Sequence, residues 1–135
     1  MSKPIKSLLV ICALAAAGIA SAQEQVVNLY SARHYPTDEA LYSGFTKATG
    51  IKIQRVDSDD AGIMARLKAE GSASPADVIL LVDAARLYRG EADGLFLPVR
   101  SKVLEDAIPA NLRATPTADG GIPWFGLSTR ARVIV

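Results

Sequence analysis

The sequence predicts an α/β fold in which a mainly parallel sheet is flanked by helices, and three observations support this prediction. Apolar, β-branched runs alternate with helix-like segments in the order strand, helix, strand, helix, strand, helix. Such alternation is typical of βαβ units, whose strands run parallel. The run at residues 76–82 is apolar enough for a strand that is buried on both faces. Capping residues and glycines separate the segments, as the boundaries of helices require.

Residues 1–22 are predicted to be a signal peptide and are not assigned to the fold. Two lysines form a positive start, residues 8–17 form an apolar stretch of secretory length, and Ala20-Ser21-Ala22 is an A-x-A cleavage site. The apolar stretch is too short to span a bilayer. Cys12, the only cysteine, follows Ile11 instead of a small residue, so no lipid anchor is expected. We therefore predict cleavage at this motif and export to the periplasm.

The charges of the chain are balanced, with 15 lysines and arginines against 14 aspartates and glutamates. Nucleic-acid binding would need a basic surface, so the composition argues against a nucleic-acid partner. Beyond residue 22 the sequence contains no cysteine, which excludes disulfides and thiolate metal sites. The composition thus indicates a near-neutral exported protein and does not indicate its function.

The first part of the chain contains three predicted strand–helix pairs. Proline and acidic residues begin the first helix, and aspartates precede the other two. We interpret Asp57, Asp59 and Asp60 as capping residues, and Asp83 likewise. The predicted strands cover residues 26–30, 51–56 and 76–82, and the predicted helices cover residues 36–49, 61–70 and 84–92.

Apolar spacing predicts which side chains of these helices face the core, because residues three and four apart share one face of a helix. The expected inward residues are Leu41, Phe45 and Ala48 in the first helix, Ile63, Met64 and Leu67 in the second, and Leu87 in the third. We expect the strand at 76–82 to be the central strand of the sheet.

The second part of the chain is predicted to contain shorter elements. Extended segments are expected at 95–99, 122–127 and 132–135, and a short helix at 101–107 stops before Pro109. The sequence stops inside an apolar strand, which is uncommon for a domain. We therefore expect it to be a fragment.

A candidate binding loop follows the first strand. Arg33, His34 and Tyr35 lie between that strand and the next helix, at the carboxyl edge where α/β sheets bind ligands. Imidazole and phenolate can both bind metals, and phenolate suits a hard cation such as Fe(III). Pro36 favours an extended Tyr35, so the loop must turn at His34 for both side chains to reach one ion. Two ligands do not complete an iron site, so others must come from elsewhere.

Spacing alone leaves this loop open to other interpretations. A histidine beside a tyrosine is more often an ordinary loop pair with satisfied hydrogen bonds, and Arg33 could pair with an anion, pair with an acidic neighbour or stay solvated. The aspartates at 57–60 lack the glycine and glutamate of an EF-hand, and no glycine-rich phosphate loop is present. The sequence shows no nucleophile–base pair, and this argues against an enzyme.

Several segments together carry a resemblance to a known family. They are residues 29–35, 45–46, 49–53, 74–78, 83–87 and 124–134, with Asp38 and Tyr42 between the first two. In these segments the sequence resembles the periplasmic iron(III)-binding proteins of ABC transporters, which are type II periplasmic solute-binding proteins. The similarity covers essentially the whole chain after the signal peptide.

The resemblance implies a binding protein with two lobes and no enzymatic activity, a monomer when full length. Such a protein captures ferric ion between its lobes, in some members with a synergistic anion, and delivers it to a permease with a cytoplasmic ATPase. Residues 23–125 would form the N-terminal lobe, and residues 126–135 would start the strand that leads to the hinge and the second lobe.

The resemblance also implies site residues. His34 and Tyr35 would be iron ligands from the N-terminal lobe. Arg33 and Ser31 would be candidates for contacts with an anion or with the ligands. The family's other tyrosine ligands belong to the second lobe and have no match here, which agrees with a fragment.

A binding protein of the same fold for another solute is the main alternative. An anion, a polyamine or thiamine would then take the place of iron. Arg33 without a tyrosine ligand would favour an anion, whereas His34 and Tyr35 together favour a metal. An enzyme on a similar scaffold and a secreted interaction module without a ligand are the remaining classes.

Overall fold

The computed structural model describes residues 24–129 of the chain. The predicted signal peptide (1–22) and the predicted strand at 132–135 lie outside the described residues. Within the described range, no helix is long and apolar enough to cross a membrane.

A parallel sheet of three strands forms the centre of the first part of the chain, as predicted. Its strands are β1 (Val26–Ser31), β2 (Lys52–Asp57) and β3 (Val78–Leu80), in the order β2-β1-β3. β1 pairs with β2 along its full length, so Ser31 lies opposite Asp57. The carboxyl ends of the three strands therefore meet at one edge of the sheet.

The prediction that residues 76–82 form the central strand is wrong for the described sheet. β3 has only three residues and lies at the edge, while β1 is in the middle. At the start of this strand the Asp77 N–H donates to the Asn28 carbonyl at 2.9 Å, but the next ladder bond is made by a side chain. Asp77 Oδ2 accepts hydrogen bonds from the backbone N–H and the side-chain amide of Asn28, at 2.8 and 3.1 Å. Val78 is 43% exposed, because no described strand covers its outer side.

Three helices follow the three strands, close to their predicted bounds: α2 (Asp38–Thr49), α3 (Asp60–Glu70) and α4 (Ala84–Ala92). α2 ends at Gly50, whose φ of 75° suits glycine. The predicted aspartate caps are confirmed for α3 and α4: Asp59 Oδ1 accepts from the Gly62 N–H at 2.7 Å, and Asp83 Oδ1 from the Arg86 N–H at 2.9 Å. Such caps satisfy backbone N–H groups that have no partner within the helix.

The main core lies between β1 and α3. Ile63, Met64 and Leu67 are buried, which confirms the predicted inner face of α3. They pack with Tyr30 of β1 and with Leu81, which follows β3. Burying side chains of this size stabilises the fold by about 1.5–3 kcal/mol each, so α3 holds the sheet from one face.

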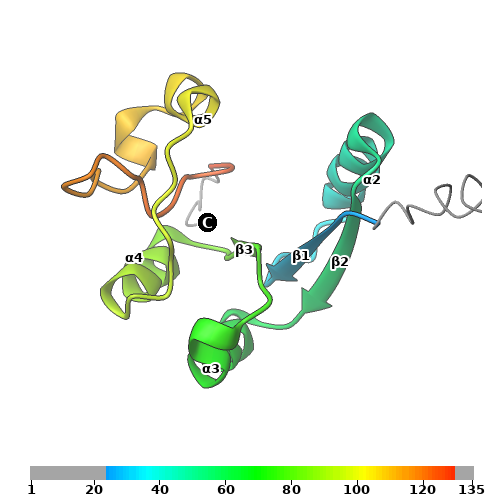
Figure 1. Ribbon diagram of the computed structural model, residues 1–135, viewed down its shortest axis with the longest axis horizontal. Coiled ribbons are helices and arrows are strands. Elements are labelled where there is room, and N and C mark those ends of the chain that lie inside the picture. The colour runs from blue at the N-terminus through cyan, green and yellow to red at the C-terminus, as the bar shows by residue number, and fades with distance from the viewer. Residues whose placement is uncertain (1–23, 130–135) are drawn as a thin grey trace, which may run out of the picture.

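The predicted inner face of α2 is wrong for the described chain. Leu41 is 57% and Phe45 38% exposed, and Ala48 is exposed as well. Tyr42 and Thr46 are half-buried instead. α2 lies beside the β2 side of the sheet and contacts little else (Figure 1). Spacing alone cannot show which apolar stripe meets a neighbour when the contact is this small.

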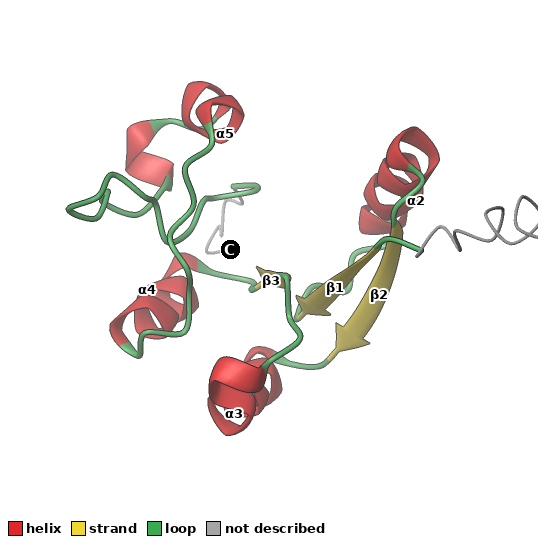
Figure 2. Cartoon of the chain, viewed as in Figure 1, coloured by secondary structure: helices red, strands yellow, loops and turns green. Residues whose placement is uncertain are grey.

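The second part of the chain lies beyond β3 and is mostly irregular (Figures 1 and 2). It contains α5 (Lys102–Ala107), which confirms the predicted helix, and a short 3-10 turn (Ala110–Leu112); another such turn, Gly71–Ala73, follows α3. The extended segments expected at 95–99 and 122–127 form only isolated antiparallel bridges, Val99 with Ile122 and Arg113 with Phe125.

The indole of Trp124 joins this irregular part to α4. Its Nε1 donates a hydrogen bond to Glu91 Oε2 at 2.8 Å, and its ring lies 6.0 Å from that of Tyr88. This hydrogen bond satisfies the one polar atom of a half-buried indole, and it holds the segment around Trp124 against α4.

Candidate functional site

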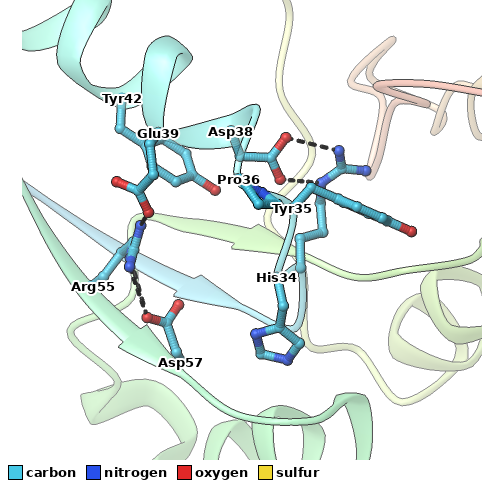
Figure 3. Close-up of a pocket in the computed structure, with 9 residues that line it drawn as sticks. His34, Tyr35, Pro36, Asp38, Glu39, Tyr42, Arg55 and Asp57 are labelled. Carbon is cyan, nitrogen blue, oxygen red and sulfur yellow. Dashed lines mark hydrogen bonds and ion pairs between the residues drawn. The ribbon is translucent and has the colours of Figure 1, made fainter.

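The predicted binding loop connects β1 to α2 at the carboxyl edge of the sheet. With the first turn of α2 and the end of β2 it encloses a pocket of about 260 Å³ (Figure 3). The lining residues are Arg33, His34, Tyr35, Pro36, Asp38, Glu39, Tyr42, Arg55 and Asp57. The fold therefore places the predicted residues where parallel α/β sheets bind ligands.

Arg33 is held in a bidentate ion pair with Asp38. Its Nε lies 2.9 Å from Oδ2 and its Nη2 3.0 Å from Oδ1 of that carboxylate, and the two side chains are only 14% and 7% exposed. The hydrogen bond from Arg33 lowers the pKa of Asp38 below its ordinary value, and the same bond raises the pKa of Arg33. Of the roles open to Arg33 from the sequence, the structure shows pairing with an acidic neighbour.

Two serines complete the surroundings of Arg33. The buried Ser31 hydroxyl accepts a hydrogen bond from the backbone N–H of Arg33 at 3.1 Å and donates one to its carbonyl at 3.3 Å, which bends the chain directly after β1. Arg33 Nη1 donates to Ser128 Oγ at 3.2 Å, across 95 residues of sequence. The loop is thus fixed to the end of the described chain as well as to α2.

His34 and Tyr35 are both exposed and leave the loop in different directions (Figure 3). Tyr35 is 41% exposed, and its ring lies against the guanidinium of Arg33, whose Cζ is 4.9 Å from the ring centre. His34 points toward the end of β2. The loop thus presents one imidazole and one phenol without bringing them together. Between residues 24 and 129, no group of three or more histidines, cysteines, aspartates and glutamates could hold a metal ion.

Sequence reasoning missed the other wall of the pocket, where Arg55 joins two carboxylates. Arg55 pairs with Glu39 of α2 and, through Nη2 at 3.1 Å, with Asp57 at the end of β2. The bond to Glu39 raises the pKa of Arg55. Its guanidinium also lies 5.2 Å from the ring centre of Tyr42. The Tyr42 hydroxyl is buried, with no hydrogen-bond partner among the described residues.

The assignment of all three early aspartates as helix caps is therefore only partly correct. Asp59 caps α3, whereas Asp57 ends β2 and lines the pocket. Asp60 lies in the first turn of α3 and accepts a hydrogen bond from the Val82 N–H at 3.2 Å. The sequence did offer a signal for Asp57: it directly follows the predicted strand at 51–56, at the same edge of a parallel sheet as the loop after the first strand.

No protein-family model matches the chain. Curated proteins do match it. Iron uptake protein A1 from Synechocystis sp. is 50% identical over 113 residues, which are 84% of this chain and 30% of that protein. The major ferric iron-binding protein of Neisseria gonorrhoeae is 30% identical over 135 residues, which are 100% of this chain and 39% of that protein. The chain thus spans about a third of the length of these relatives.

Solved structures of similar proteins share the fold. The Trichodesmium protein IdiA (FutA), in complex with iron and citrate, has a TM-score of 0.66 and 46% identity over 75% of this chain and 30% of its own. The ferric binding protein from Campylobacter jejuni has a TM-score of 0.64 and 40% identity over 70% of this chain and 29% of its own. The described residues therefore have the architecture of part of a type II periplasmic binding protein.

Proposed function

This chain is homologous to about a third of the length of iron uptake and ferric iron-binding proteins, and we propose on that basis that it forms part of a periplasmic binding protein that captures Fe(III). One observation carries the proposal beyond homology. A histidine and a tyrosine that are adjacent in the sequence lie on an exposed loop at the carboxyl edge of the parallel sheet, where they line a pocket. A phenolate oxygen is a hard anionic donor that suits Fe(III).

In this proposal Tyr35 and His34 are the ligands that the described part of the chain supplies. Neither side chain is buried, so an ion can reach both of them. Two donors leave most positions of a ferric ion open, so groups outside residues 24–129, or a bound anion, complete the site. The Trichodesmium relative, which holds iron and citrate, supports the role of an anion.

Transport follows as the biological role. We place the protein in the periplasm, since a relative from Serratia marcescens is named an Fe(3+)-binding periplasmic protein. Its partners would be the permease and ATPase of an ABC importer, and it would bind and release iron without catalysing a reaction. Its N-terminal lobe would comprise residues 23–125, and residues 126–135 would lead to the hinge and a second lobe.

Ferric citrate titrated into the complete gene product tests this function. Iron bound by a phenolate gives a visible charge-transfer band, which we expect to grow to saturation. Tyr35→Phe should weaken iron binding about tenfold or more and reduce the charge-transfer band. His34→Ala should weaken iron binding but leave the band, because the phenolate is still present.

Tyr88→Phe is the matched control, because Tyr88 is an exposed tyrosine on α4, at 66%, outside the pocket. If the folded protein showed no band, the proposal of iron binding would be overturned, and an anion or an organic solute would become the favoured ligand. A band unchanged by Tyr35→Phe would keep iron but move its site away from this loop.

A further inference from the structure

We propose that Arg33 is a positioning residue for the iron-binding loop: it holds the Tyr35 ring in place and ties the loop to Ser128. The inference rests on the proposed function. The sequence left Arg33 as a candidate for contacts with an anion or with the ligands, and the inference assigns it to the second of these roles, through named contacts.

The first step is that Arg33 itself is fixed. Three of its nitrogens have separate partners: Nε and Nη2 on the Asp38 carboxylate, and Nη1 on the Ser128 hydroxyl. A bidentate arginine–carboxylate pair fixes the orientation of the guanidinium on the carboxylate. The third bond anchors another nitrogen of the same group to Ser128. At 14% exposure, the side chain also has little room to adopt another rotamer.

The second step is that the fixed guanidinium contacts the proposed ligand. Arg33 Cζ lies 4.9 Å from the centre of the Tyr35 ring, within the range of a cation–π contact. Tyr35 lies on a loop, outside any helix or strand, and is 41% exposed. The guanidinium thus limits the directions that the phenol can take before iron arrives.

The third step is that Asp38 neutralises Arg33 and leaves it poorly suited to recruit an anion. The carboxylate comes from the first turn of α2, so the helix and the loop are joined by one ion pair. Groups that orient metal ligands in this way usually contribute about 10–100-fold to metal affinity. Lysine could keep the charge of Arg33 but not its planar fork.

Ferric citrate titration of the complete gene product tests the role, with affinity and the maximum of the charge-transfer band as readouts. Arg33→Gln and Asp38→Asn should each weaken binding about tenfold or more and shift the band. Arg33→Lys should not rescue either property. Ser128→Ala removes one hydrogen bond and should weaken binding about threefold, without threatening the fold.

Glu70→Gln is the control for stability. It breaks another arginine–carboxylate pair, Arg66 with Glu70 at 2.7 Å, far from the loop. We expect it to lower the melting temperature while leaving affinity and band unchanged. A wild-type protein with no band would overturn the proposed function and this inference with it. A normal wild-type band that Arg33→Gln and Ser128→Ala leave unchanged would overturn the positioning role alone.

Discussion

Replacing a helical glycine by alanine should have opposite effects on stability at two positions of this fold. Gly44 lies within α2, and a Cβ there would meet no heavy atom within 4 Å. Gly90 lies within α4, and a Cβ there would be 2.3 Å from Cζ and 2.7 Å from Cε2 of Phe96. Alanine favours a helix over glycine by about 1 kcal/mol. We therefore expect Gly44→Ala to raise the free energy of unfolding by about 0.5–1 kcal/mol.

At Gly90 the same gain is opposed by a larger cost. The Phe96 ring is half-buried and packs against the core around Tyr30 and Ile63, so moving it away from α4 disturbs contacts on its other face. Overpacking of this kind costs about 1–3 kcal/mol. After subtraction of the helix gain, Gly90→Ala should lower the free energy of unfolding by about 1 kcal/mol.

Urea unfolding followed by the fluorescence of Trp124, the single tryptophan, measures both effects. Phe96→Leu should relieve the clash, so Gly90→Ala should cost less in that background, with a coupling of about 1 kcal/mol. If Gly90→Ala stabilised the protein as much as Gly44→Ala does, Phe96 could not lie against Gly90, and the packing of α4 described above would be wrong.

Two further predictions concern polar contacts. Tyr30→Phe should lower the free energy of unfolding by about 1 kcal/mol, because the buried Tyr30 hydroxyl donates to both oxygens of Glu70, at 2.9 and 3.0 Å; unchanged urea denaturation would contradict this. The lowered pKa of Asp38 adds stability above the ordinary carboxyl value of 3.8, and that stability is lost as the pH falls through the lower folded value. Asp38→Asn should therefore flatten the pH dependence of the melting temperature below about pH 4, and an identical acid profile would argue against the ion pair.

Local signals predicted the strand–helix order well. The caps at Asp59 and Asp83, the end of α2 at Gly50 and the buried face of α3 all depend on residues within one or two turns of each other. The position of β3 in the sheet depends on pairing between distant segments, so the apolar character of residues 76–82 could not reveal it.

The candidate site was predictable only in part for the same reason. The loop residues were found because histidine and tyrosine carry recognisable chemistry, and the ligand roles of His34 and Tyr35 remain proposals. The partner of Arg33 lies five residues away, across a helix boundary, and Ser128 lies 95 residues away. Neither contact leaves a periodic pattern in the sequence.

The bond between Arg33 and Ser128 also has a consequence for the order of folding. In an otherwise unfolded chain, closing a loop of 95 residues costs about 2.6 kcal/mol more in entropy than closing the five-residue loop to Asp38. The ion pair should therefore form early, with α2, and the serine contact late, after the sheet has brought distant segments together. By the same reasoning, the serine contact should open first in the native protein. The loop amides should then exchange earlier than the amides of the sheet, and their exchange would report on the last event of folding.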